Sequence, residues 1–161
     1  MTRASAAMRS RDASGPAIGA TVPVIVVGLD GSPTSWDAFS WAAGQAARAN
    51  GRLIAVYVTS AVAPVAAVGA PFDYAAVEQT RQEVAGQLKD EAARRANDLG
   101  VAVGFVWELG DVAHALTSVA RSVDADLVVV GRSAKMLHHL AGSLGRRLVS
   151  RHDAPVTVVV P

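Results

Sequence analysis

Five short apolar runs, each about as long as one β-strand, constrain the fold of this chain more than any other feature. They are rich in valine and isoleucine and show no alternation with polar residues, which is typical of strands buried on both faces. The runs cover residues 24–29, 53–58, 101–107, 127–131 and 156–160. Segments long enough for helices lie between them, so the alternation predicts a parallel α/β sheet.

Residues with strong capping preferences mark the ends of the predicted helices. Ser32 followed by Pro33 favours a helix start, and Gly51 favours its end near residue 50. A second, long helix is predicted over residues 73–99, and Asp111 is the predicted N-cap of the third. Apolar residues expected to face the core recur at helical spacing. They are Trp36, Phe39, Ala43 and Ala47 in the first helix, Tyr74, Val77, Val84, Leu88, Ala92 and Leu99 in the second, Val112, Leu116, Val119 and Val123 in the third, and Leu144 and Leu148 in the last.

Composition excludes several classes of protein. The 161 residues are 51% hydrophobic and 18% charged, which suits one domain with one core and argues against general disorder. A formal net charge of +1 gives no basic field that would attract nucleic acid. The apolar runs are far shorter than the roughly 20 residues of a membrane-spanning helix. The absence of cysteine excludes disulfides and thiolate catalysis and is compatible with a cytoplasmic location.

The first 22 residues differ from the rest of the chain. They are rich in alanine, serine and arginine and contain no continuous apolar segment, so they do not resemble a secretory signal. We interpret residues 1–22 as a flexible N-terminal tail, although an organelle transit peptide has a similar composition. Residues 23–161 are predicted to form the single domain.

Residues 126–143 have the sequence of a phosphate-binding segment. An apolar strand ends at Gly131, a basic loop follows, and the chain restarts at Gly142-Ser143 before a short amphipathic helix. Glycine permits close approach of the backbone to a ligand, and a helix start offers free N–H donors. The adjacent His138 and His139 diverge as neighbouring side chains do, so we predict a solvated basic loop there and no metal site.

In the order and spacing of its motifs, the chain resembles the universal stress protein family over nearly all of residues 23–161. The matching motifs are Val-Gly-Leu-Asp-Gly-Ser at 27–32, Glu-Leu-Gly-Asp at 108–111, Ala-Asp-Leu-Val-Val-Val-Gly at 125–131, Gly142-Ser143, and Ala-Pro-Val-Thr-Val-Val-Val at 154–160. The resemblance implies a doubly wound, five-stranded parallel sheet of order 3-2-1-4-5, like that of the adenine nucleotide alpha hydrolases. Such sheets bind ligands where the strand order reverses, here between the first and fourth strands.

The chain departs from the pattern of the ATP-binding members of that family. Their pattern is a glycine, two residues, a second glycine, nine residues, and then Gly-Ser or Gly-Thr. Here the second glycine is replaced by Ala134, and only the seven residues 135–141 precede Gly142. Two fewer residues remove about 7 Å of reach, which shortens a loop meant to wrap a triphosphate.

The resemblance also implies nucleotide-binding residues, each of which has a purely structural alternative. Asp30 would lie near adenine and ribose, or it forms the turn before a capped helix. Val58 would line the adenine slot, or it belongs to the sheet core. The remaining candidates follow the fourth strand, where Gly142 and Ser143 can equally be an ordinary helix start. They are Gly131, Arg132, Ser133, Ala134, Gly142, Ser143 and Leu144, whereas Arg146, Arg147 and Arg151 are predicted to form a solvated helix face.

The leading hypothesis is a cytoplasmic universal stress protein that is not an enzyme. It would bind ATP or another adenine nucleotide, which would order residues 132–141 and bias a surface for an unknown protein partner. By resemblance it would form a homodimer through residues 156–160, an apolar strand at a sheet edge that needs cover. No contact with nucleic acid or membrane is expected.

Two alternatives remain open from the sequence. The shortened loop favours an interaction or scaffold protein of the same fold that binds no nucleotide. The less favoured alternative is an adenylating or nucleotide-hydrolysing enzyme, whose typical Ser-Gly-Gly-x-Asp-Ser loop is here Leu29-Asp-Gly-Ser-Pro33. No nucleophile–base signature and no phosphate loop ending in Gly-Lys-Ser is present.

Overall fold

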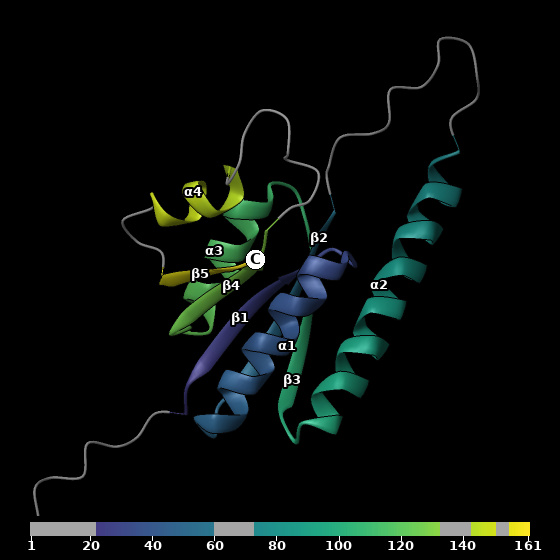
Figure 1. Cartoon of the computed structure of the whole chain (residues 1–161). Coiled ribbons are helices and arrows are strands. Elements are labelled where there is room, and N and C mark those ends of the chain that lie inside the picture. Colours follow the sequence, from purple (N-terminus) through teal and green to yellow (C-terminus); the bar gives the residue numbers. More distant parts are fainter. Residues whose placement is uncertain (1–21, 60–72, 133–142, 151–154) are drawn as a thin grey trace, which may run out of the picture.

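The computed structural model describes residues 22–59, 73–132, 143–150 and 155–161, and these form one parallel sheet with helices on both faces (Figure 1). The tail (1–22), the connection 60–72 and the loop 133–142 fall wholly or almost wholly outside the described residues. The elements in chain order are β1 (Val24–Leu29), α1 (Pro33–Arg48), β2 (Arg52–Thr59), α2 (Tyr74–Asp98), β3 (Ala102–Leu109), α3 (Val112–Ser122), β4 (Leu127–Gly131), α4 (Ser143–Val149) and β5 (Val156–Val160).

The strand order is β3-β2-β1-β4-β5, which confirms the predicted doubly wound topology. Val26 of β1 pairs with Ile54 of β2 on one side and with Val128 of β4 on the other. The chain therefore winds outward from β1 to β3 and then crosses back to β4. This reversal places the carboxyl ends of β1 and β4 side by side, where open α/β sheets bind ligands.

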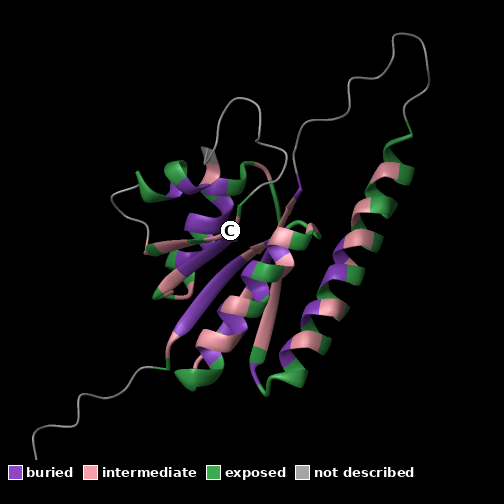
Figure 2. Ribbon diagram, in the orientation of Figure 1, coloured by how far each residue is buried: buried purple, intermediate pink, exposed green. Residues whose placement is uncertain are grey.

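Apolar side chains form two core layers, one on each face of the sheet. Figure 2 shows the buried residues along the central strands and on the sides of the helices that face the sheet. Val27 packs with Phe39 on the face covered by α1 and α2, and both are fully buried. Val26 packs with Leu116 and Leu148 on the face covered by α3 and α4. Burial of successive β1 residues on opposite faces explains why this run shows no polar alternation.

The helix starts are capped by the residues that the sequence indicated. The Ser35 amide donates to Ser32 Oγ at 3.2 Å, and the His114 amide donates to Asp111 Oδ1 at 2.9 Å. Asp73, which was predicted as the first residue of the second helix, is instead its cap and accepts from two amides at the start of α2. These caps fix the starts of α1 and α3 relative to the sheet, which matters because both starts border the site described below.

The Ser32 cap offers a first test of the structure. Replacing Ser32 with alanine removes the acceptor for the Ser35 amide and should lower the free energy of unfolding by about 1 kcal/mol. Urea denaturation of the purified variant measures this loss. Ser32→Asp is the matched control because aspartate is an equally good cap, and it should retain wild-type stability. Equal stability of all three proteins would contradict the capping geometry.

Some of the predicted helix faces are wrong at their ends. Tyr74 is 71% exposed and Leu99 is 48% exposed, although both continue the apolar spacing of α2. The buried residues of α2 all lie between Ala85 and Ala96, so only that portion packs on the sheet. Ala47 and Val112 are likewise exposed. The spacing of apolar residues identifies which face of a helix is apolar. It does not show over what length of the helix other elements cover that face.

Candidate functional site

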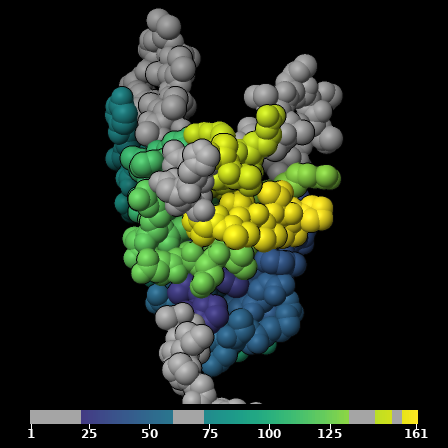
Figure 3. All heavy atoms as spheres, turned by 90° about the vertical axis from the view of Figure 1, so that its left-hand side faces the viewer, coloured from purple at the N-terminus to yellow at the C-terminus, as the bar shows by residue number. Residues whose placement is uncertain are grey.

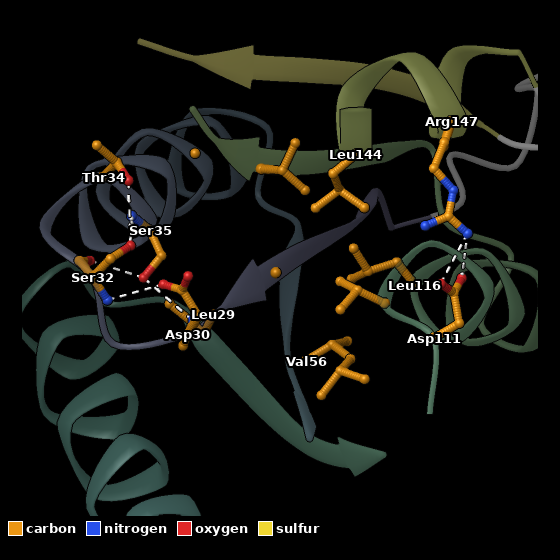
Figure 4. A pocket seen from close by; sticks show the side chains of 15 residues that line it. Leu29, Asp30, Ser32, Thr34, Ser35, Val56, Asp111, Leu116, Leu144 and Arg147 are labelled. Atoms are coloured by element: carbon orange, nitrogen blue, oxygen red, sulfur yellow. Dashed lines mark hydrogen bonds and ion pairs between the residues drawn. The ribbon is translucent and has the colours of Figure 1, made fainter. Parts of the chain in front are cut away.

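A cavity of about 310 Å³ opens at the carboxyl end of the sheet, where the strand order reverses (Figure 4). Strand ends form one part of its lining and the starts of α1, α3 and α4 form the rest. The residues at the strand ends are Gly28, Leu29, Val56, Val58, Val130 and Gly131, and Asp30 directly follows β1. The residues from the helix starts are Ser32, Thr34, Ser35, Asp111, Val112, Leu116, Leu144 and Arg147.

The middle of the cavity is apolar and depends on a glycine. A β-carbon added at Gly28 would lie 3.4 Å from both Leu116 Cδ1 and Val130 Cγ1. Because Gly28 has no side chain, space remains between β1 and α3 that a larger residue would fill. Leu116 and Val56 are almost fully buried beside it. Such an apolar slot suits a flat ring, with polar groups at its ends fixing orientation.

One end of the cavity is a network of short polar side chains. Asp30 Oδ1 accepts from the Ser32 amide at 2.9 Å, and Ser35 Oγ donates to the Ser32 carbonyl at 2.9 Å. The hydroxyls of Ser32 and Thr34 lie 3.2 Å apart. Asp30 therefore belongs both to the turn before α1 and to the cavity lining. The two interpretations made from the sequence, a turn residue and a residue of the ligand site, are thus compatible with each other. That Asp30 contacts a ligand remains a prediction.

The glycine at the end of β4 has a packing explanation. A β-carbon at Gly131 would lie 2.3 Å from the Thr34 carbonyl oxygen and 2.9 Å from the Ser35 amide nitrogen. The end of β4 thus touches the backbone of the first turn of α1. Close approach at Gly131 was predicted, but the group that approaches in the structure is the protein's own main chain.

The other end of the cavity is charged. Arg147 Nη2 donates to both carboxylate oxygens of Asp111 at 2.8 Å, which links the start of α3 to α4. Arg147 lies on an exposed helix face, as predicted, with its side chain 55% exposed, and its guanidinium also pairs with Asp111. Arg147 is three positions after Leu144 on α4, so both side chains point toward the cavity (Figure 4).

Four of the predicted nucleotide-binding residues line the cavity: Asp30, Val58, Gly131 and Leu144. Arg132 is exposed, and its amide donates to the Val160 carbonyl at 2.8 Å, so it is placed beside β5 and outside the lining. Ser143 is the first residue of α4. Ser133, Ala134 and Gly142 lie outside the described residues.

Sequence reasoning missed most of the helix-start residues of the lining. Ser32 and Asp111 were identified only as caps, and Arg147 only as a surface charge. A helix cap that follows the carboxyl end of a parallel strand could have been recognised as a site residue, because that end of the sheet carries the binding crevice. Arg147 could have been recognised from its position three residues after Leu144, which places the two side chains next to each other on α4.

A sheet whose strand order reverses, with a pocket of this kind at the reversal point, defines an open α/β protein whose pocket lies where such folds bind ligands. The particular family follows from comparison with known proteins. The family model described as "Universal stress protein family" matches residues 22–160. The chain belongs to the universal stress protein family.

Several relatives show the extent of this similarity. The chain is 32% identical over 154 residues to universal stress protein MT2052 of Mycobacterium tuberculosis, covering 84% of this chain and 47% of that protein. It therefore spans about half the length of this curated relative. A Burkholderia pseudomallei family structure matches at 28% identity with a TM-score of 0.70, covering 89% of this chain and 98% of the other.

One solved relative was determined with a ligand. A universal stress protein in complex with cAMP matches at 25% identity with a TM-score of 0.65, covering 86% of this chain and 96% of the other. More distant family structures, at 14% and 17% identity, hold dAMP and AMP. At that distance the likeness establishes the fold alone.

Among the residues that the structure describes, no group of three or more histidine, aspartate or glutamate side chains is placed to hold a metal ion. None of the helices in those segments is both long and apolar enough to cross a membrane.

Proposed function

We propose that this protein is a cytoplasmic, non-enzymatic universal stress protein that binds an adenine nucleotide between β1 and β4. The cavity of about 310 Å³ at the reversal point carries this proposal. Its size lies at the lower end of the range for small-molecule sites, which is roughly 300–1,000 Å³. A relative of 25% identity in complex with cAMP supports the same class of ligand.

The lining suggests how the nucleotide lies. The apolar slot beside Val56, Val58 and Leu116 fits the adenine ring, because aromatic rings favour flat apolar walls. Asp30 at the polar end is placed to accept from ribose hydroxyls. The phosphate then points toward the β4–α4 side of the cavity. In this arrangement the nucleotide acts as a signal that stabilises one conformation of the protein.

Calorimetric titration tests the proposal directly. ATP, ADP, AMP and cAMP are titrated separately, with GTP as the control for the base. We expect saturable binding of at least one adenine nucleotide and none of GTP. If no adenine nucleotide binds at millimolar concentration, the proposal fails. The alternative of a nucleotide-free interaction protein, which the shortened sequence between Gly131 and Gly142 favours, then takes its place.

Catalysis is a separate question from binding. Most members of the family are not enzymes, although some are. We propose the non-enzymatic role because nucleotide binding alone can shift a conformational equilibrium. Conversion of ATP to AMP and pyrophosphate, or to ADP, under turnover conditions would instead support the enzymatic alternative.

We further propose that the protein forms a homodimer through β5. This strand is at the edge of the sheet, and Figure 3 shows it (yellow) running across one face of the molecule. Val156 is 66% exposed and Val159 is 45% exposed. An apolar edge strand exposed in this way invites pairing with a second chain.

Charge placed on this edge should disrupt the dimer. We expect Val159→Asp to convert the dimer into a monomer, as measured by light scattering after gel filtration, because pairing would bury the new carboxylate. Leu109→Asp, on the opposite edge strand β3, is the matched control, since Leu109 is 60% exposed. A monomeric wild type, or a dimeric Val159→Asp variant, would contradict the proposed interface.

A further inference from the structure

The ion pair at the charged end of the cavity joins two elements that both border the proposed nucleotide site. Asp111 caps α3 and Arg147 projects from α4, and the guanidinium reaches both carboxylate oxygens at 2.8 Å. The side chains of Arg147 and Asp111 are 55% and 47% exposed. Solvent thus reaches this pair while it borders the apolar slot (Figure 4).

The charges of the described lining residues are unbalanced. Arg147 is the cationic side chain among them, whereas Asp30 and Asp111 are both acidic. A ligand phosphate entering this lining therefore meets one favourable charge and two unfavourable ones. The favourable charge is already engaged by Asp111.

We propose that Arg147 selects phosphorylated ligands in this cavity, by exchanging its partner from the Asp111 carboxylate to the ligand phosphate. Asp111 positions the guanidinium at the cavity when the site is empty and competes with the phosphate for it. This inference rests on the proposed function, because it assigns the phosphate end of the same site.

The energetics favour such an exchange. An exposed ion pair contributes at most about a fivefold change in an equilibrium constant, so breaking it costs little. An arginine–phosphate pair is bidentate and charge-assisted, and forming it strengthens binding by roughly tenfold or more. The opposing effect of Asp111 grows with the charge of the ligand, because Coulomb repulsion scales with that charge.

The two residues can be altered without removing structural features. Asn is as good an N-cap as Asp, so Asp111→Asn keeps the acceptor for the His114 amide while it removes the charge and one of the two oxygens that accept from Arg147. Arg147→Lys keeps the charge and removes the planar fork. Arg146→Ala is the matched control, because Arg146 is an exposed neighbour on α4 that does not line the cavity.

The experiment compares adenosine, cAMP and AMP on the wild type and these variants, with Arg147→Ala added, by calorimetry at low salt. We expect Arg147→Ala to weaken cAMP and AMP roughly tenfold and adenosine not at all. Asp111→Asn should strengthen AMP by about threefold to fivefold and cAMP by less. Arg147→Lys should lie between wild type and Arg147→Ala, and Arg146→Ala should match wild type.

Several outcomes would overturn the inference. Equal weakening of adenosine and AMP in Arg147→Ala would show a structural role, and weaker AMP binding in Asp111→Asn would show that the carboxylate does not compete. An equal loss in Arg146→Ala would indicate general surface charge. If adenosine and AMP bind the wild type but Arg147→Ala changes neither, the proposed function stands and the inference fails. If none of the ligands binds the wild type, both fail.

Discussion

Gly131→Ala is expected to destabilise the fold by about 3 kcal/mol, at the upper end of the range for overpacked sites. The added β-carbon would lie 2.3 Å from the Thr34 carbonyl oxygen, a distance that atoms in proteins do not tolerate. The obstructing atoms belong to the main chain of α1, so no side chain can rotate away. Relief requires α1 and β4 to separate, which loosens the core packing of both.

Urea denaturation of Gly131→Ala measures this effect, with Gly86→Ala as a matched control. Gly86 lies within α2, and a β-carbon there meets nothing within 4 Å. Alanine at that position should therefore stabilise the protein by about 0.5–1 kcal/mol through helix propensity. The two glycine-to-alanine changes are predicted to act in opposite directions. An unchanged urea midpoint for Gly131→Ala would show that the close approach is absent in solution.

The same contact explains why sequence alone gave an incomplete account of Gly131. A glycine after a buried strand, followed by a basic loop, indicates close approach of some group to the backbone. The sequence cannot identify that group, because a phosphate and the first turn of α1 require the same absence of a side chain. The identity of the neighbour depends on how α1 lies across the sheet, which is a tertiary property.

Much of the fold, in contrast, was predictable from local features of the sequence. The unalternating valine run of β1 requires cover on both faces, and only a parallel sheet between helix layers supplies it. Ser32 and Asp111 then specify where helices start. The exposure of Tyr74 and the pairing of Arg147 with Asp111 were not predictable in this way. Both depend on where neighbouring elements end, and local spacing does not contain that information.

The candidate site was predictable in its position more than in its chemistry. Strand order places the ends of β1 and β4 together, so Asp30 and Gly131 were expected near the ligand. The charged end was not expected, because Asp111 and Arg147 are 36 positions apart in sequence and meet only through the packing of α3 against α4. A cap and a surface arginine become one ion pair only when the topology brings their helices together.

Gly28→Val should abolish nucleotide binding while leaving the fold intact. The added β-carbon would make ordinary contacts of 3.4–3.5 Å with Leu116 and Val130, so the strand itself has room for it. The two further methyl groups of valine then enter the apolar slot in which adenine is proposed to lie. Valine also suits a strand interior better than glycine, which offsets part of the crowding of Leu116 and Val130 by its methyl groups, so the free energy of unfolding should fall by about 1 kcal/mol or less.

The expected loss of affinity for adenosine and for its nucleotides is at least a hundredfold, which corresponds to about 2.8 kcal/mol. Gly28→Ala is the graded control, because a single methyl group reaches Leu116 without filling the slot, and it should weaken binding only a few-fold. Calorimetry gives the affinities, and thermal unfolding confirms that each variant is folded. Because this substitution acts on the base and not on the phosphate, its effect should be equal for adenosine and AMP, in contrast to that of Arg147→Ala. Wild-type affinity in a folded Gly28→Val protein would place the nucleotide outside this cavity.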